Sequence, residues 1–191
     1  MVAVDAARRS LRTRRLVLTP VKAAHAHALH PLIDDWEVVR MLAVLPWPVP
    51  LESVEAFAAG REKPGSEEDA FAILLEGAPI GVCGVKHPGS GDRPRKMPRL
   101  GYWIGRPYWG MGFGTEAVGA LAAFAFERFR SAEVIGAGVF KDNPASRRVL
   151  EKLGFRRVGG HAVKCVSRGE SVPTDNMHLT RIDWLARASG T

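Results

Sequence analysis

The fold of this chain is decided by one stretch of sequence, Tyr108-Trp109-Gly110-Met111-Gly112-Phe113-Gly114-Thr115-Glu116-Ala117. Three glycines alternate with larger residues, between a β-like apolar run and an amphipathic helix. Glycine permits tight turns and lets a ligand approach the backbone closely. The first turn of a helix has unpaired N–H groups and a partial positive charge. The stretch therefore predicts an anion site, and a phosphate or pyrophosphate is the natural ligand.

The spacing of this glycine loop excludes two common nucleotide-binding loops. A dinucleotide fingerprint requires G-x-G-x-x-G, and a Walker loop ends in G-K-[ST]; neither pattern is present in residues 108–117. Thr115 adds a hydroxyl at the helix start and also suits a capping role. Glu116 complements the helix dipole but partly competes with a bound anion. A purely structural glycine-rich turn is the alternative.

The composition is that of a single globular domain outside membranes. The 191 residues suffice for one sizeable core, and 46% hydrophobic with 25% charged residues is ordinary for such a domain. No apolar run is long enough to cross a membrane, and the arginine-rich start lacks the apolar stretch of a signal peptide. Two cysteines, Cys83 and Cys165, cannot build a disulfide framework, which favours a cytoplasmic location.

The net charge of +7 fits a polyanionic cofactor, an acidic partner or nucleic acid. Arginine is spread along the chain, and the sequence has neither a zinc-finger spacing nor an RNP-type aromatic motif. These features argue against nucleic acid as the main ligand, although a basic RNA-associated protein is a further alternative.

The pattern along the chain predicts a flexible basic arm (1–13), one α/β domain (14–185) and a short tail (186–191). Strands are expected where apolar residues alternate or cluster between turn signals, at 15–21, 70–76, 79–86, 99–104, 133–140, 155–166 and 175–183. Helices are expected at 22–33, 34–42, 52–62, 115–129 and 144–153. Gly77-Ala78 predicts a hairpin turn.

A second dense segment, residues 141–155, reads Lys-Asp-Asn-Pro-Ala-Ser-Arg-Arg-Val-Leu-Glu-Lys-Leu-Gly-Phe. Asn143 is a good N-cap and Pro144 a good first helical residue. Gly154 is a natural left-handed helix stop. Most of this segment therefore has a structural explanation, whereas Asn143 and Ser146 suit either a cap or a ligand contact.

Together the two segments resemble the GNAT superfamily of N-acetyltransferases. Gly101-Tyr102-Trp103-Ile104 and the glycine loop resemble its acetyl-CoA pyrophosphate motif, and residues 143–155 resemble its second cofactor segment. The sequences of both motifs are most similar to those of the Rim-like branch, which includes ribosomal-protein N-acetyltransferases. Specific matches cover residues 99–158, and weaker agreement in element order extends over 14–184. One departure is Trp109, where the wider family has Gln or Arg, although the Rim-like branch tolerates Trp.

The resemblance implies a GNAT fold, in which a central mixed, mostly antiparallel sheet of about seven strands splays open and is flanked by helices. It also implies direct acetyl transfer from acetyl-CoA to an amine, without an acyl-enzyme and without a metal. Pantetheine then lies between the strands at 99–105 and 133–140 and pairs with the backbone of Trp103 and Ile104. A backbone N–H there polarises the thioester carbonyl.

The residues implied to bind the cofactor are Trp103, Ile104, Met111, Gly112, Phe113, Gly114, Thr115, Asn143 and Ser146. Two of them are also the implied catalytic residues. Asn143 contacts the pantetheine arm, and Ser146 hydrogen-bonds the cofactor or donates a proton to the leaving thiolate, directly or through water. Many relatives use a tyrosine as this acid, and residues 143–155 contain none.

The sequence constrains the amine acceptor less than it constrains the cofactor. Many Rim-like proteins carry Glu just before the Gly-Tyr-Trp run, where this chain has Leu100. With a pKa of about 7.7–8.0, about a tenth of an α-amine is neutral near pH 7. The neutral fraction of a lysine amine at the same pH is below roughly a thousandth. The missing carboxylate therefore favours an α-amine, so a protein or peptide N-terminus is the expected acceptor. A small-molecule amine (amino acid, polyamine or aminoglycoside) and a non-catalytic acetyl-CoA-binding module are the alternatives.

Five further residues have weaker claims to the site. Trp47, in a proline-rich connection, is expected to line the acceptor pocket, and it equally suits an aromatic clamp on the core. His25, His27 and His30 do not share a helix face, and no H-E-x-x-H pattern occurs, so no metal site is expected. His178 suits packing better than an acceptor contact. A monomer or a homodimer is expected.

Overall fold

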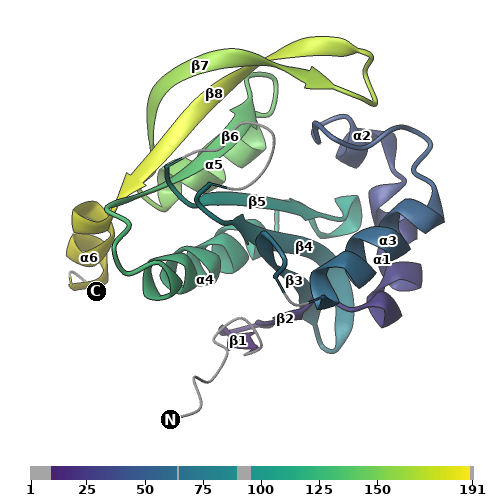
Figure 1. Cartoon of the computed structure of the whole chain (residues 1–191), viewed down its shortest axis with the longest axis horizontal. Coiled ribbons are helices and arrows are strands. Elements are labelled where there is room, and N and C mark those ends of the chain that lie inside the picture. Colours follow the sequence, from purple (N-terminus) through teal and green to yellow (C-terminus); the bar gives the residue numbers. More distant parts are fainter. Residues whose placement is uncertain (1–9, 64, 90–95, 190–191) are drawn as a thin grey trace.

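The computed structural model describes residues 10–63, 65–89 and 96–189, and its central feature is an eight-stranded sheet (Figure 1). The order is β1-β2-β3-β4-β5-β6-β8-β7, and neighbours are antiparallel except β5 and β6. The strands are β1 (Leu11–Arg12), β2 (Leu16–Pro20), β3 (Glu68–Leu75), β4 (Ala78–Lys86), β5 (Arg99–Ile104), β6 (Val134–Phe140), β7 (Arg156–Cys165) and β8 (Glu170–Thr180).

The expected fold class, a mixed and mostly antiparallel sheet, is confirmed. The described residues contain one more strand than expected, because Leu11–Arg12 pair with β2. The expected basic arm (1–13) includes this pair, and residues 1–9 of the arm lie outside the described residues.

Helices cover both faces of the sheet (Figure 1). They are α1 (Ala26–Ile33), α2 (Trp36–Val39), α3 (Leu51–Glu62), α4 (Phe113–Arg128), α5 (Pro144–Lys152) and α6 (Arg181–Ser189), with the 3₁₀ turns η2 (Ala23–His25) and η3 (Arg106–Tyr108). In the part of the chain that the structure describes, no helix is long and apolar enough to cross a membrane.

Two expected element boundaries are corrected. The strand expected over 175–183 begins earlier, at Glu170, and ends at Thr180. It ends there because the Thr180 hydroxyl accepts a hydrogen bond from the backbone N–H of Asp183 at 3.1 Å and so starts α6. The turn between β3 and β4 is centred on Glu76 and Gly77, which have φ of 51° and 86°, rather than on Gly77 and Ala78. Two successive positive φ values are typical of the type I′ hairpin turn.

Side chains of consecutive residues in the central strands pack into hydrophobic cores on opposite faces of the sheet, as strand alternation requires. Leu100 and Ile104 of β5 belong to the core formed with α4, whereas Trp103 packs against the core formed with α1 and α3. Phe71 of β3 contacts Phe124 of α4 edge-to-face, with ring centroids 5.1 Å apart. The sheet thus presents two different faces to any ligand that lies between its strands.

The parallel strands β5 and β6 pair only at Arg99↔Gly136 and Leu100↔Ala137. Beyond Leu100, β5 continues to Ile104 and β6 to Phe140 without further described pairing. The predicted splay of the sheet is therefore confirmed. We call the resulting gap, between residues 101–104 and 138–140, the strand opening.

Candidate active site

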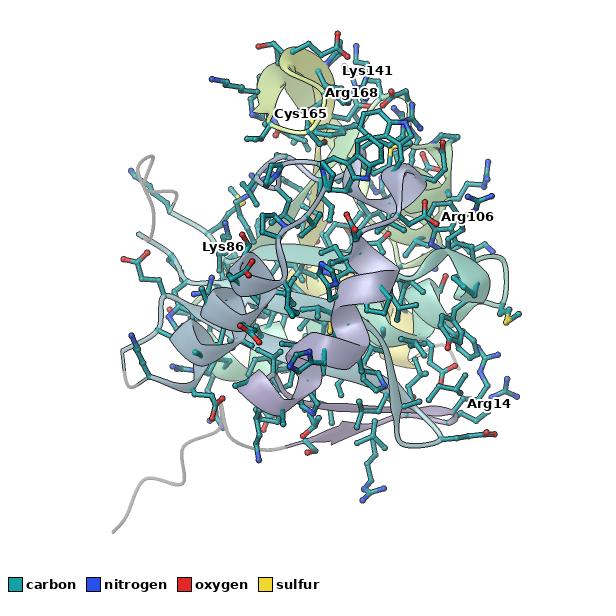
Figure 2. All side chains as sticks on the ribbon, turned by 90° about the vertical axis from the view of Figure 1, so that its right-hand side faces the viewer. Arg14, Lys86, Arg106, Lys141, Cys165 and Arg168 are labelled. Carbon is teal, nitrogen blue, oxygen red and sulfur yellow. The ribbon has the colours of Figure 1, made fainter. Side chains whose placement is uncertain are left out.

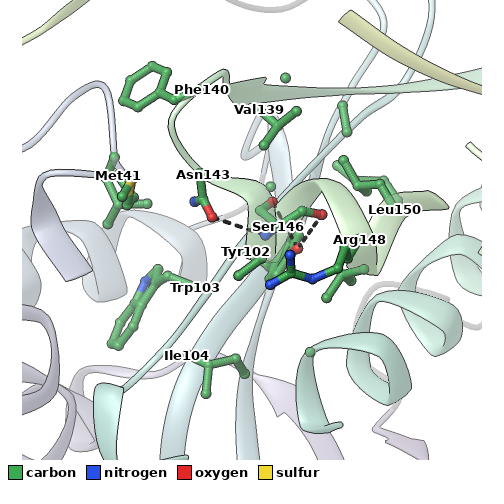
Figure 3. Close-up of a pocket in the computed structure, with 18 of the residues that line it drawn as sticks. Met41, Tyr102, Trp103, Ile104, Val139, Phe140, Asn143, Ser146, Arg148 and Leu150 are labelled. Carbon is green, nitrogen blue, oxygen red and sulfur yellow. Dashed lines mark hydrogen bonds between the residues drawn. The ribbon is translucent and has the colours of Figure 1, made fainter. Parts of the chain in front are cut away.

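A cavity of about 720 Å³ lies at the strand opening (Figure 3). Its walls come from β5, the glycine loop, the start of α4, β6, α5 and the segment after α2. It brings together nearly all the residues singled out in the two motifs: Trp103, Ile104, Gly112, Phe113, Gly114, Thr115, Asn143 and Ser146. Met111 lies in the same loop, is 55% exposed and is not part of the lining.

The glycine loop presents the start of α4 to the cavity. Gly110 and Gly112 have φ of 77° and 82°, a left-handed conformation that side chains rarely adopt. Gly112 is the N-cap, and no side chain caps the helix, so Thr115 does not act as its cap. The helix begins at Phe113, two residues before the expected start, and its first N–H groups lack intrahelical partners. Such N–H groups at a helix start are suited to binding an anion.

Arg15, which precedes β2, holds this loop in place. Its Nε donates to Glu116 Oε2 at 2.7 Å, its Nη1 donates to the Met111 carbonyl at 3.0 Å, and its guanidinium lies 4.5 Å from the Phe113 ring centroid. The Thr13 hydroxyl donates to Glu116 Oε1 at 2.6 Å. Burial alone would raise the pKa of Glu116, but the hydrogen bonds from Thr13 and Arg15 hold that pKa below its ordinary value. The carboxylate is thus neutralised by Arg15, which reduces the expected competition with a bound anion.

The backbone of β5 offers a free edge to the strand opening. The Gly105 N–H donates to the Ile80 carbonyl of β4 at 2.8 Å, so by ladder alternation the backbone groups of Tyr102 and Ile104 face the opposite side. The same alternation directs the backbone of Trp103 to β4 and not to the opening. The Ile104 carbonyl accepts from Trp109 Nε1 at 2.6 Å, which ties the glycine loop to the end of β5. This contact gives Trp109 a structural role.

Asn143 and Ser146 meet at the start of α5. Asn143 Oδ1 accepts from the Ser146 N–H at 3.0 Å, which confirms Asn143 as the N-cap. The Ser146 hydroxyl lies 2.9 Å from Tyr102 Oη, so a tyrosine reaches Ser146 from β5, across the opening (Figure 3). The sequence alone does not indicate this role of Tyr102, because the tyrosine that relatives use as an acid was expected within residues 143–155.

The Tyr102–Ser146 pair stays protonated at neutral pH. Burial raises the pKa of Tyr102 to about 12, and the hydrogen bond with Ser146 only partly offsets this effect. The pair therefore supplies a hydroxyl proton that can be donated to a group in the opening. A phenol this weakly acidic is better suited to hydrogen bonding than to complete proton transfer near pH 7.

A buried carboxylate with two arginine partners links α5 to β7 and β8. Asp175 of β8 is fully buried and contacts Arg147 of α5 and Arg157 of β7, the latter at 2.7 Å. The hydrogen bond from Arg157 holds the pKa of Asp175 below its ordinary value, burial opposes this, and the charge of Arg147 adds to the lowering. The next residue of α5, Arg148, lines the cavity together with Lys152 and adds positive charge at its α5 wall.

The other side of the cavity carries apolar groups around Trp103. Met41 also lines this side, and Figure 3 shows Met41 and Trp103 across the opening from Ser146. Trp47 lies outside the cavity lining, is 50% exposed and contacts Trp36 edge-to-face at 5.3 Å. Within the described ranges, no three His, Cys, Asp or Glu side chains are close enough to hold a metal ion.

Comparisons with known proteins agree with this geometry. The model of the acetyltransferase (GNAT) domain matches residues 15–156, more than half of the chain. The chain is 26% identical over 153 residues to the uncharacterized N-acetyltransferase p20 of Bacillus licheniformis, which covers 78% of this chain and 84% of the relative.

Two solved structures share the fold. Mycobacterium smegmatis RimJ in complex with CoA-disulfide has a TM-score of 0.79 at 20% identity, covering 96% of both chains. AAC(6')-Ib in complex with ribostamycin and coenzyme A has a TM-score of 0.75 at 20% identity, covering 90% of this chain and 96% of that chain. At these identities the likeness shows the fold alone.

Proposed function

The chain belongs to the acetyltransferase (GNAT) family, and from this premise we propose that it transfers acetyl directly from acetyl-CoA to the α-amine of a protein or peptide N-terminus. The observation that carries the proposal is the strand opening, which has an uncapped helix start at one end and the Tyr102–Ser146 pair in its wall. The motif sequences and the fold shared with RimJ support placing the chain in the Rim-like branch.

The cavity fits acetyl-CoA from the phosphate end. The N–H groups of Phe113, Gly114 and Thr115 bind the pyrophosphate, as helix starts bind anions elsewhere. Arg148 and Lys152, on the α5 wall, add cations for the remaining phosphate charge. No side chain hydrogen-bonds the first N–H groups of α4 as a cap, which leaves these groups to an anion.

The free edge of β5 fits the pantetheine arm. The backbone groups of Tyr102 and the N–H of Ile104 pair with its amides like an added strand. The Asn143 side chain uses its Oδ1 as a cap, which leaves its NH₂ group for the arm. A backbone N–H of β5 stabilises negative charge that develops on the acyl oxygen.

The Tyr102–Ser146 pair acts on the leaving sulfur. Acetyl-CoA supplies the activated acyl group, and these hydroxyls donate a hydrogen bond to the thiolate that departs. With a pKa of about 12, Tyr102 stabilises the sulfur without surrendering its proton. The proton lost by the amine leaves through water.

The α-amine is favoured because it needs little help from a base. About a tenth of an N-terminal amine is neutral near pH 7, whereas the neutral fraction of a lysine amine is below roughly a thousandth. An acceptor that is already partly neutral fits a cavity in which Leu100, and not a carboxylate, precedes the Gly-Tyr-Trp run.

Rates on matched peptides test this proposal. One peptide has a free α-amine with its lysine blocked, and the other has a free ε-amine with its N-terminus blocked. We expect CoA release and peptide acetylation with the first peptide, and a clear ε-amine preference would refute the choice of acceptor. Spermidine and ribostamycin complete the panel, and acetyl-CoA binding without transfer to any amine would instead indicate a binding module.

A further inference from the structure

Glu68, the first residue of β3, brings a carboxylate into the wall of the cavity. It is part of the cavity lining, and its side chain is only 13% exposed. Its Oε1 lies 2.7 Å from the place that a Cβ at Gly84 of β4 would take, so the carboxylate lies directly over this glycine. A side chain at position 84 would collide with it. The absence of a Cβ at Gly84 therefore makes room for the carboxylate of Glu68.

This carboxylate lies close to Gly101 of β5, at the strand opening. Gly84 and Gly101 are register partners, and the Cβ positions of such partners are about 4.5–5.5 Å apart. Glu68 Oε1 is therefore at most about 8 Å from the place of a Cβ at Gly101. No atom of the described residues lies within 4 Å of that place. An amine above Gly101 would reach Oε1 directly or through one water, which is the distance that a general base requires.

Arg61 of α3 holds the carboxylate in this position. Its Nη2 lies 2.9 Å from Glu68 Oε2, the other oxygen of the carboxylate, while Oε1 points to Gly84. The guanidinium of Arg61 is itself held against the Phe57 ring, with Cζ 4.9 Å from the ring centroid. One oxygen of Glu68 thus binds an arginine, and the other faces the floor of the cavity.

Glu68 lies at the end of the strand opening away from the glycine loop. Its register partners, Lys86 of β4 and Arg99 of β5, flank it on the same face of the sheet. Figure 2 shows Lys86 well apart from Arg106, which begins η3 and leads from β5 toward the glycine loop. Because the phosphates are proposed to bind at that loop, the acyl group and the amine meet toward the other end, where Glu68 lies.

Two other groups that can accept a proton line the cavity. They are Glu37 of α2 and His161 of β7. The Glu37 side chain is 45% exposed. Both residues belong to walls formed by α2 and β7, and not to the strands next to Gly101. Among these groups, Glu68 is therefore the one that the strand register places beside the proposed position of the amine.

We propose that Glu68 is the general base for the acceptor amine. The inference rests on the acetyl transfer proposed above. A neutral α-amine still carries a proton that must leave once its nitrogen bonds to the acyl carbon. In this step the N–C bond forms, the C–S bond breaks, and the N–H proton passes to Glu68 Oε1 directly or through one water. CoA leaves as the thiolate held by the Tyr102–Ser146 pair, and Glu68 then releases its proton to solvent.

Glu68→Gln tests this role because it keeps the size of the side chain and removes the basic oxygen. With an N-terminal peptide as acceptor, kcat should fall about a hundredfold. The calorimetric affinity for acetyl-CoA and its KM should change by less than about threefold, which also shows that the variant is folded. Glu55→Gln is the matched control, because it removes a carboxylate from α3 that is 45% exposed and outside the cavity lining. It should keep the wild-type rate.

Rescue by formate distinguishes proton acceptance from a structural role. Glu68→Ala leaves space in which this small carboxylate can take the place of the missing base, so added formate should raise kcat. It should not raise kcat in Glu68→Gln, where the side chain still fills the space. Arg61→Gln removes the partner of the carboxylate but keeps the base, so it should lower kcat less than Glu68→Gln does, and formate should not alter its rate.

Three results would overturn the role of Glu68 alone. They are a kcat in Glu68→Gln close to that of the wild type, an equal loss in Arg61→Gln without formate rescue of Glu68→Ala, and a larger loss in Glu37→Gln or His161→Gln than in Glu68→Gln. In each of them the wild type still acetylates the peptide. Acetyl-CoA binding by the wild type without transfer to any amine would instead refute the proposed function, and the role of Glu68 with it.

Discussion

Replacing Arg15 by glutamine tests how the glycine loop is held. The change removes the hydrogen bonds of the guanidinium to Glu116 and Met111 and its contact with the Phe113 ring. It also leaves the carboxylate of Glu116, only 15% exposed, without its cation in the first turn of α4. Both effects act on the part of the cavity proposed to bind pyrophosphate.

The magnitude follows from the contacts. Charge-assisted hydrogen bonds contribute about 1.5–3 kcal/mol each, but the Arg15 side chain is 34% exposed and solvent screens it. We therefore expect a loss of about 1–2 kcal/mol in the free energy of unfolding. The unpaired charge of Glu116 should weaken acetyl-CoA binding about tenfold, which corresponds to about 1.4 kcal/mol.

Calorimetric titration of acetyl-CoA into the wild type, the two single variants and the double variant of Arg15 and Glu116 separates the two effects. Glu116→Gln in the Arg15→Gln background removes the unpaired charge, so acetyl-CoA affinity should recover to within about threefold of the wild type. The free energy of unfolding, measured in urea, should not recover. Wild-type affinity in Arg15→Gln, or no recovery in the double variant, would refute the reasoning.

Four further substitutions probe other contacts in and around the site. Tyr102→Phe removes the hydroxyl that contacts Ser146, so steady-state kinetics should show kcat about tenfold lower and a KM for acetyl-CoA changed by less than about threefold. Asp175→Asn leaves Arg147 and Arg157 without their carboxylate and should cost about 1–2 kcal/mol of unfolding free energy at pH 7, because both arginines are partly exposed and solvent screens them. Because the folded pKa of Asp175 is lowered, this stabilisation is lost as the pH falls below 3.8, and thermal melts of variant and wild type should converge there. Gly112→Ala should lose about 1 kcal/mol because its φ is positive, whereas Gly114→Ala, within α4, should be neutral or stabilising in the same melts.

The sequence predicted those features that depend on local backbone requirements. Gly112 has the positive φ expected of the glycine loop, and Gly154 ends α5 with a φ of 93°. Asn143 caps α5 through the Ser146 N–H, as its place before Pro144 indicated. In each case one residue and its chain neighbours determine the geometry, so no knowledge of tertiary contacts is needed.

The contacts that complete the site join segments distant in sequence. Tyr102 and Ser146 are 44 residues apart, and Arg15 and Glu116 are 101 apart. Strand alternation beside Trp103 indicates which face Tyr102 occupies, but not that Ser146 lies opposite. Which residues of β3, β4 and β5 lie side by side depends on the strand register, which hydrophobic patterns alone do not fix to the residue.

Direct acetyl transfer to an N-terminal amine is the central claim. Isotope-labelled acetyl-CoA, an N-terminal peptide and the protein are incubated together, and the products are identified by mass spectrometry. We predict label on the α-amine of the peptide, one CoA released for each acetyl group transferred, and no label on the protein. Label held covalently by the protein as an intermediate, or bound acetyl-CoA with no labelled amine, would contradict the account.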